Sequence, residues 1–388
     1  MVVFGTRPEA IKMAPVVRRL ESLRDALETV VTVTGQHREM LDSVLNHFGI
    51  APKYDLKVMK PSQDLTGTMA RTLARLGRVV SFEKPDMVLV HGDTLTTLAG
   101  ALSAYFGGCR LGHVEAGLRT WDKAAPFPEE MMRTLTDHLS DLLFPPTEWA
   151  RDNLLREGLG RGRTVVTGNT AIDALLMTVA GLHEFSDSFL ESLVRRRFIL
   201  VEVHRRENFG EPLRRICRAL RTIAESRRDI ELVVSVHPNP NVKRVVEKVL
   251  GGVPRVHLFA PFEYVDWAHL MKRSHLIVTD SGGLQEEAPS LGKPVLLARE
   301  KTERPEALRA GTVRLVGSDP AAIVDSVNEL LDDPSSYERM SRASNPYGDG
   351  RAAERVVGAL LHYLGLSDEM PAEFAFFGDG GRFEHGGT

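Results

Sequence analysis

The sequence predicts an α/β protein made of two doubly wound parallel-sheet domains. Short apolar runs rich in β-branched residues alternate with segments of helical period along both halves of the chain, and no run of consecutive strands interrupts them. The length of 388 residues fits two domains, because one domain commonly has roughly 150 residues. We expect the loops at the strand ends of the two domains to face each other across a cleft.

The composition is that of a globular protein, with 43% hydrophobic and 26% charged residues. The net charge of −3 predicts neither nucleic acid nor an anionic membrane as a partner. Two cysteines, Cys109 and Cys217, make neither a disulfide framework nor a metal-ligand cluster, which favours a reducing compartment. No apolar run approaches about 18 residues, and the N-terminus lacks a signal-peptide pattern, so we expect a cytoplasmic protein.

The first half opens with a strand at 2–4, followed at once by a glycine turn and a helix that has Pro8 in its first turn. The next strand is predicted at 30–34, and residues 65–80 have the spacing of an amphipathic helix. The remaining strands of this half are predicted at 87–90, 111–114, 142–144 and 164–166.

Charged side chains follow these strands directly. Arg7 and Lys12 flank the turn after the first strand, and Asp93 and Glu115 follow the strands at 87–90 and 111–114. Ligands in open α/β sheets bind beyond the carboxyl ends of the strands. We therefore expect Arg7, Asp93 and Glu115 to lie together on one rim, which is the edge of the sheet where the parallel strands end. For Arg7 and Lys12 the alternative is a pair of ordinary surface cations.

A loop at 119–128 contains two prolines and has the length of a functional loop, and a helix opens directly after it at Glu129. Glu129 and Arg133 lie one turn apart on the same helix face. One interpretation is a surface ion pair worth at most about 0.5 kcal/mol. The other is that Glu129, beside the loop, reaches the rim.

The second half repeats the alternation of strands and helices. His204 and Arg205 follow its first predicted strand, and His237 follows the second. A helix is expected over 216–223. The strands of this half are predicted at 198–203, 230–236, 256–259, 276–278 and 312–315.

Residues 274–304 form the most informative stretch of this half. A buried strand leads into Ser281, Gly282 and Gly283, and a helix is predicted from 284 to 291. Glycines that lead into a helix N-terminus favour a phosphate, although an ordinary strand-to-helix turn is the alternative. A carboxylate one turn into the helix, Glu286 or Glu287, can accept hydrogen bonds from the hydroxyls of a ribose, so the pattern indicates a nucleotide diphosphate.

The predicted rim combines cations with acid and base groups, which fits proton transfer on a phosphorylated or nucleotide-linked substrate. The sequence has no Gly-x-Gly-x-x-Gly after the first strand, no Walker-type loop and no Gly-x-Ser-x-Gly elbow. These absences disfavour a dinucleotide oxidoreductase, a P-loop enzyme and a serine hydrolase. His204 and His237 are not at metal-ligand spacing along a helix.

The motifs of this chain closely resemble those of the bacterial non-hydrolysing UDP-N-acetylglucosamine 2-epimerases. The resemblance runs in the same order from residue 2 to about residue 362. The matching segments are GTRPEAIKMAP, QHREML, HGDTLTT, GHVEAGLRT, PEEMMRTLTDHL, GNTAIDALL, HRREN, TDSGGLQEEAPSLGKPVL and TERPEAL.

The resemblance implies the GT-B fold, with two Rossmann-like domains around a cleft. The N-terminal domain would cover 1–168 and the UDP-binding domain 169–345. A C-terminal helix at about 352–364 would return to the first domain, and 368–388 would be a loosely ordered tail. The resemblance further implies a homodimer and a reaction without cofactor or metal.

The implied reaction interconverts UDP-N-acetylglucosamine and UDP-N-acetylmannosamine. The hydrogen on C2 of the sugar is not acidic enough for simple deprotonation, because no carbonyl stands next to it. The family's route eliminates UDP across C1–C2 to give 2-acetamidoglucal. UDP then adds back with a proton on the opposite face of C2, which demands acid and base groups near both faces.

By resemblance, Asp93, Glu115 and Glu129 are the acid and base candidates, and His204 lies close to the leaving diphosphate. Arg7, Ser281 and Gly283 would hold the phosphates with support from Lys12, and Glu287 would bind the ribose. The wider substrate-binding set adds Arg133, Arg205, His237, Trp267, Gly282 and Arg304. Trp267 is expected either to stack near the uracil or to belong to the core.

Many members of the family bind a second UDP-N-acetylglucosamine as an activator, and Gln36 and His37 match the segment that binds it. The chain departs from the family's pattern at Glu39, where some members carry glutamine, and at Val203, where a small residue is common. The departure at Glu39 puts activation in question.

Other functions share the same UDP site. They are a hydrolysing relative that releases free N-acetylmannosamine, an epimerase for a modified UDP-hexosamine, a GT-B glycosyltransferase and a catalytically silent UDP-sugar binder. The carboxylates Asp93, Glu115 and Glu129 favour epimerisation over these alternatives.

Overall fold

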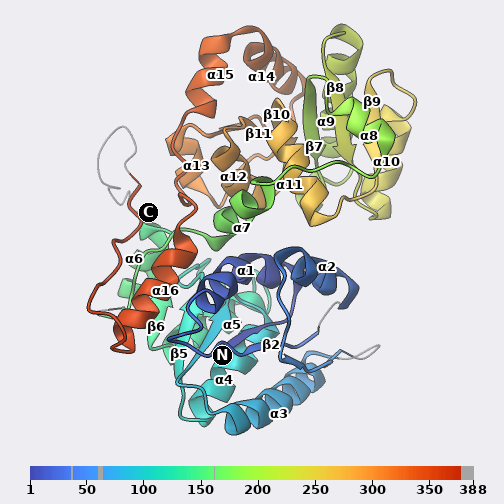
Figure 1. Ribbon diagram of the computed structural model, residues 1–388. Helices are drawn as coiled ribbons and strands as arrows, with labels where there is room; N and C mark the ends of the chain where they lie inside the picture. The colour runs from blue at the N-terminus through green and yellow to red at the C-terminus, as the bar shows by residue number, and fades with distance from the viewer. Residues whose placement is uncertain (36–37, 60–63, 161, 377–388) are drawn as a thin grey trace. The chain divides into compact units, whose positions relative to one another are not determined.

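A computed structural model of the chain describes residues 1–35, 38–59, 64–160 and 162–376. The chain divides into two compact units (Figure 1). The N-terminal unit comprises Met1–Ala174 and Tyr347–Ala375, and the C-terminal unit is built on Leu175–Pro346.

The N-terminal unit has one sheet of six parallel strands in the order β3-β2-β1-β4-β5-β6. Its strands are β1 Val2–Phe4, β2 Val31–Val33, β3 Tyr54–Asp55, β4 Met87–His91, β5 Arg110–Val114 and β6 Leu142–Phe144. The prediction of a strand at 164–166 is wrong, because this segment makes only a single isolated bridge, between Leu143 and Thr164.

Helices cover this sheet, and the apolar face of the central strands packs beneath them. The cluster there includes Val3 from β1, Val88 and Val90 from β4, and Leu76 and Ala99 from two helices. The helices are α1 Arg7–Glu21, α2 Arg38–Phe48, α3 Leu65–Glu83, α4 Leu95–Phe106, α5 Glu129–Leu139, α6 Glu148–Arg156, the start of α7 Thr170–Val179, and α16 Ala352–Tyr363. The returning helix α16 packs against α1 (Figure 1).

The C-terminal unit repeats this topology with the strand order β12-β11-β10-β7-β8-β9. Within each sheet, every pairing between strands is parallel, as alternating strands and helices predict. The strands are β7 Phe198–Glu202, β8 Glu231–Ser235, β9 Val256–Phe259, β10 Leu276–Thr279, β11 Val295–Leu297 and β12 Val313–Leu315.

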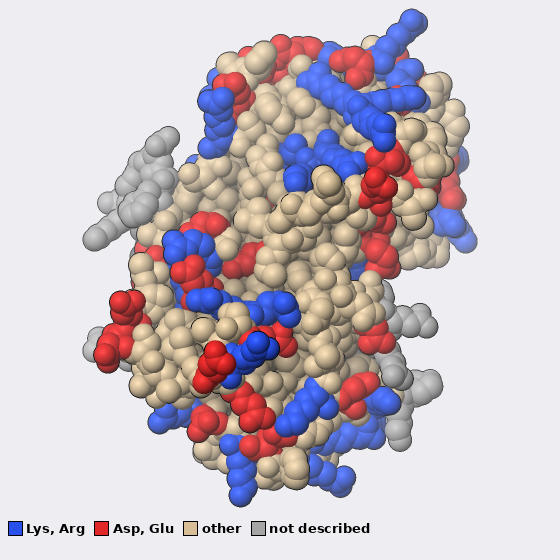
Figure 2. All heavy atoms as spheres, in the orientation of Figure 1, with Lys and Arg blue, Asp and Glu red and all other residues tan. Residues whose placement is uncertain are grey.

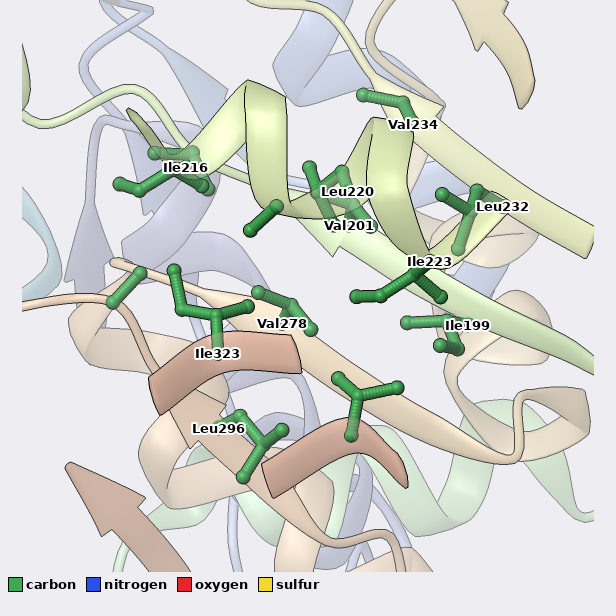
Figure 3. Packing of buried hydrophobic residues seen from close by; sticks show 14 of the residues in the cluster. Ile199, Val201, Ile216, Leu220, Ile223, Leu232, Val234, Val278, Leu296 and Ile323 are labelled. Carbon is green, nitrogen blue, oxygen red and sulfur yellow. The ribbon is translucent and has the colours of Figure 1, made fainter. Parts of the chain in front are cut away.

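A large apolar core stabilises the C-terminal unit. In Figure 3, Ile216, Leu220 and Ile223 of α9 point onto Val201 of β7 and its neighbours. Each fully buried aliphatic side chain of this size contributes about 1.5–3 kcal/mol. The helices are α8 Ser188–Leu193, α9 Glu211–Ser226, α10 Pro240–Leu250, α11 Tyr264–Arg273, α12 Gly282–Glu287, α13 Pro305–Ala310, α14 Pro320–Asp332 and α15 Pro334–Ser341, with short 3₁₀ turns at Arg206–Asn208 and Ala288–Leu291.

Two sequence predictions need correction here. The helix after Ser281 begins at Gly282, two residues early, and tightens into the 3₁₀ turn Ala288–Leu291, where Pro289 cannot donate an α-helical hydrogen bond. Of the tail predicted to be loose at 368–388, the structure describes the part up to 376, and this part is held at Phe374, which is 8% exposed and donates its N–H to the carbonyl of Val166 at 2.8 Å.

Charge on the surface is mixed. On the face drawn in Figure 2, Lys and Arg side chains lie among Asp and Glu side chains rather than forming one basic field. Within the described residues, every helix is too short or too polar to cross a membrane.

Candidate active site

The order of strands reverses at the centre of each sheet. The switch lies between β1 and β4 in the N-terminal unit and between β7 and β10 in the C-terminal unit. In open α/β sheets, ligands bind beyond the carboxyl ends of the strands at such a point. The loops that leave these four strands and β5 carry most of the residues predicted to be functional.

Glu115 leaves β5 in the left-handed conformation, with a φ of 66°. Strain at a residue with a side chain is characteristic of functional sites. Its carboxylate forms an ion pair with the ammonium of Lys12 and lies 3.7 Å from Nε2 of His91. Burial by itself raises the pKa of Glu115, but the attraction of Lys12 and His91 outweighs burial and holds the pKa well below its usual range. Glu115 is therefore ionised at neutral pH.

Asp93 follows β4 after Gly92, whose φ of 69° turns the chain. Its carboxylate lies 3.1 Å from the guanidinium of Arg133. Burial and the negative charge of Glu115 raise the pKa of Asp93, and Arg133 offsets this only in part. The pKa values of Asp93 and Glu115 are thus displaced in opposite directions, which is how a site separates an acid from a base.

The partner of Arg133 differs from the prediction. Arg133 is 7% exposed, and its guanidinium binds Glu130 and Asp93, so the surface pair with Glu129, one of the two interpretations that the sequence left open, is wrong. Glu130, 3% exposed, also accepts the N–H groups of Thr120 and Trp121, each at 2.9 Å. Glu130 therefore holds the 119–128 loop against α5 and orients the guanidinium of Arg133 toward Asp93.

Glu129 stands at the first position of α5, as predicted, and is half-buried. Among the residues that the structure describes, it makes no side-chain hydrogen bond or ion pair. Its assignment as an acid or base stays a prediction.

Sequence reasoning missed Glu9, which connects the loops after β1 and β4. Glu9 is 2% exposed, and its Oε2 accepts the backbone N–H groups of Gly5 at 3.0 Å and Thr6 at 2.7 Å. Its Oε1 accepts the hydroxyl of Thr94 at 2.7 Å. The Thr-x-x-Glu spacing of a capping box was the signal. Arg7, the first residue of α1, is held by this cap.

In the C-terminal unit, sequence reasoning also missed Asp280, which joins the two central strands. Asp280 is fully buried at the end of β10. Its carboxylate accepts the backbone N–H groups of His204 at 3.0 Å and Arg205 at 2.8 Å, and the side-chain amide of Asn208 at 2.9 Å. Asp280 thereby fixes the start of the loop that follows β7.

His204 and His237, from neighbouring strand ends, stack with ring centroids 5.3 Å apart. Burial lowers the pKa of His204, and the attraction of Asp280 restores it only in part. His204 is therefore mostly neutral at pH 7. Nδ1 of His237 accepts the N–H of Asn239 at 3.1 Å, which leaves Nε2 as the ring donor.

Two arginines lie over the predicted glycine turn. A Cβ added at Gly282 would lie 2.6 Å from the guanidinium of Arg304 and 3.0 Å from that of Arg205, so any larger residue would displace these two head groups from the turn. Glu303 contacts the head groups of both arginines. Ser281 and Gly283 flank this position, and the N–H of Ser281 donates to the hydroxyl of Thr279 at 2.9 Å.

The two glutamates of this helix differ in their surroundings. Glu286 accepts Nε of Arg304 at 2.6 Å, so it belongs to the arginine cluster. Glu287 lies one turn beyond Gly283, with Oε1 3.9 Å from the Cβ position of that glycine. Glu287 therefore remains the candidate for a ribose.

Trp267 lies on α11, half-buried, with its ring centroid 6.1 Å from that of Phe262. It is not part of the central apolar cluster of its unit. Gln36 and His37 lie outside the described residues. Within the described part of the chain, no group of three or more His, Cys, Asp or Glu side chains could hold a metal ion.

Two doubly wound sheets, with paired carboxyl groups at one switch point and an arginine-covered glycine turn at the other, define an enzyme for a phosphorylated or nucleotide-linked substrate. The family model described as UDP-N-acetylglucosamine 2-epimerase matches residues 20–361. The UDP-N-acetylglucosamine 2-epimerase of Escherichia coli strain K12 is 52% identical over 368 residues, which are 93% of this chain and 97% of that protein. The chain belongs to the UDP-N-acetylglucosamine 2-epimerase family.

Solved structures agree with this assignment. A crystal structure of a UDP-N-acetylglucosamine 2-epimerase has a TM-score of 0.90 and 47% identity, covering 97% of this chain and 98% of that one. The Neisseria meningitidis enzyme bound to UDP-GlcNAc has a TM-score of 0.81 and 45% identity, covering 93% and 98%. The family resemblance and the fold class of two Rossmann-like units are confirmed.

Proposed function

We propose that this protein is a UDP-N-acetylglucosamine 2-epimerase, an isomerase that interconverts UDP-N-acetylglucosamine and UDP-N-acetylmannosamine. The observation that carries the proposal is the pair of carboxyl groups at one switch point, with Glu115 in an ion pair with Lys12 and Asp93 lying 3.1 Å from the guanidinium of Arg133. Relatives of the same family that bear this activity as their name support it.

The C-terminal unit supplies groups suited to the leaving group. Arg205 and Arg304 present two guanidiniums over the backbone of Gly282, with Glu303 as their shared partner. A diphosphate carries more charge than one carboxylate and is bound bidentately by arginine, so it can replace Glu303. Ser281 and Gly283 would contact the same phosphates, and Glu287 the ribose.

The N-terminal unit supplies the proton transfers. In the elimination, the carboxylate of Glu115 takes the proton from C2 while the C1–O bond breaks and its electron pair leaves with UDP. In the return step, an oxygen of UDP attacks C1 and the carboxyl group of Asp93 gives a proton to the other face of C2. Each turnover thus leaves Glu115 protonated and Asp93 ionised, and both must exchange protons before the next one.

The neighbours of the two carboxyl groups fit these roles. Lys12 favours the ionised form of Glu115, and the negative charge of Glu115 favours the protonated form of Asp93. His204, largely neutral, can donate a hydrogen bond to the departing diphosphate without adding a full charge. Glu129 remains a third candidate for proton transfer.

Proton NMR in heavy water with UDP-N-acetylglucosamine tests the proposal. We expect UDP-N-acetylmannosamine that carries deuterium at C2, because the returning proton comes from an exchangeable carboxyl group. Free N-acetylmannosamine plus UDP would overturn it in favour of hydrolysis. Unchanged substrate with folded protein would also overturn it, for this substrate.

Three accompanying features are part of the proposal. Both cysteines, Cys109 and Cys217, are free, which supports work in a reducing compartment, the cytoplasm. We also propose a homodimer and a second UDP-N-acetylglucosamine as activator. Sedimentation and the substrate dependence of the rate test these two features.

A further inference from the structure

A buried histidine on β5 contacts the turn that precedes Asp93. His113 is the fourth residue of β5 and is fully buried. Its Nδ1 lies 2.6 Å from Oδ1 of Asp137 on α5, and its Nε2 lies 2.7 Å from the carbonyl oxygen of Gly92. Neither contact belongs to the acid and base chemistry described above.

Both partners of the ring are acceptors. A carboxylate and a backbone carbonyl have no proton to offer, whereas a neutral imidazole has a single N–H. A neutral ring would therefore turn a lone pair toward an oxygen at one of these two short contacts. Only the imidazolium, with an N–H on each nitrogen, satisfies both hydrogen bonds.

The surrounding charges balance an imidazolium. Asp137 is fully buried and also binds the guanidinium of Arg119 at 2.7 Å, and Arg119 in turn binds Glu157 at 2.8 Å. Burial raises the pKa of Asp137, but His113 and Arg119 outweigh burial and lower it. The imidazolium of His113 and the guanidinium of Arg119 are thus paired with the carboxylates of Asp137 and Glu157, as buried charges require.

The titratable groups on the other elements around His113 lie at the strand ends. His91 is on the neighbouring strand β4, and Asp93 and Glu115 follow β4 and β5. Asp141, before β6, accepts the N–H of Leu111 at 2.8 Å. The helix α4 has no Asp, Glu, Lys, Arg or His in its sequence.

The contacts of this cluster reach both loops of the proposed active site. The carbonyl of Gly92 faces His113, and its N–H donates to the carbonyl of Val114 at 2.9 Å, so the peptide before Asp93 is held on both sides. The other oxygen of Asp137 accepts the N–H of Gly117, two residues after Glu115, at 3.2 Å. The buried pair of His113 and Asp137 therefore fixes the positions of the two loops that carry Asp93 and Glu115.

We propose that His113 is a positioning residue that acts as a buried imidazolium, through which Asp137 fixes the Gly92–Asp93 turn relative to Glu115. The inference rests on the proposed epimerase reaction for its kinetic consequence. Its structural consequence, two protons on one buried ring, does not depend on any activity.

The first test is nitrogen NMR of the whole wild-type protein labelled at histidine, with Asp137→Asn to assign the signals. We expect one histidine to keep two slowly exchanging ring N–H groups through neutral pH. Asp137→Asn should convert it to a ring with a single N–H, since Nδ1 then accepts from the asparagine amide. A single ring N–H on His113 in the wild type would overturn the proposal.

The second test is steady-state kinetics of Asp137→Asn, with His138→Asn as the matched control. His138 is the next residue on α5, but its ring is exposed, and its Nε2 lies 3.3 Å from the carboxylate of Glu157. We expect kcat of Asp137→Asn to fall about 100-fold with KM nearly unchanged, as loss of catalytic geometry does. The control should resemble the wild type.

The outcomes separate the two proposals. Wild-type kcat in a folded Asp137→Asn variant would overturn the positioning role. If the wild type has no epimerase activity, the proposed function fails, while the nitrogen spectrum still decides the protonation of His113. If Asp137→Asn does not fold, the wild-type spectrum still tests the proposal without an assignment, because a spectrum in which no histidine keeps two slowly exchanging ring N–H groups would overturn it.

Discussion

Lys12 of α1 forms an ion pair with Glu115, which stands after β5 in a left-handed conformation. The two residues are 103 positions apart in the chain. The pair lies at the edge where β1, β4 and β5 end, so sheet order creates it. The ammonium of Lys12 keeps the carboxylate of Glu115 ionised. The pKa of the neighbouring Asp93 is displaced upward.

Lys12→Met should shift the pH dependence of catalysis. Without the ammonium, the pKa of Glu115 rises, so the base is protonated at higher pH. The acidic limb of kcat/KM should therefore move to higher pH, by at least about one unit for a charge lost at contact distance. Lys12→Arg, which keeps the charge, should leave the limb nearly in place. An unmoved limb in Lys12→Met would refute the role of the pair.

Removing the carboxyl groups should abolish most turnover. We expect Asp93→Asn and Glu115→Gln each to lower kcat by about 10²–10⁴-fold, the usual contribution of a positioned acid or base. We expect a loss of the same order for Glu129→Gln. Circular dichroism before the assay checks that each variant is folded. Near-normal rates in all three variants would defeat the assignment of this site.

Glu130→Gln should reduce stability more than Glu129→Gln. Glu130 is buried against Arg133, and breaking a buried ion pair on one side costs about 3–5 kcal/mol. Glu129 makes no such pair within the described residues, so its substitution should change the free energy of unfolding by less than about 0.5 kcal/mol. Urea unfolding compares the two neighbours directly, and equal losses would contradict the structural difference.

Asp280→Asn should weaken UDP binding. The amide cannot accept as well as the carboxylate from the N–H groups of His204 and Arg205, so the loop after β7 loses its anchor. We expect the Kd for UDP, measured by calorimetry, to rise about tenfold, since a hydrogen bond to a buried charge contributes about 1.5–3 kcal/mol. Asp266→Asn on α11, paired with His183 instead, is the control. Unchanged affinity in Asp280→Asn would argue against an anchoring role.

Much of the fold and of the site was predictable because it is local. The helix α5 begins at Glu129, as the prolines before it indicate, and β4 and β5 end where Asp93 and Glu115 were expected to follow. The Thr6–Glu9 capping box was equally readable but was overlooked. The predicted strand at 164–166 failed because short apolar runs also occur in loops that pack on a sheet edge.

The sequence by itself determined the alternation of strands and helices, the glycine turns at the strand ends, and the types of charged residue there. These features depend on neighbouring residues and on the spacing of apolar side chains, which repeats every two residues in a strand and about every 3.6 residues in a helix. Only the tertiary structure decided which charges meet: Lys12 with Glu115, Arg133 with Glu130 and Asp93, and Asp280 with the loop after β7. The physical reason is that pKa values and ion pairs depend on distance and burial, and both are set by strand order across many tens of residues.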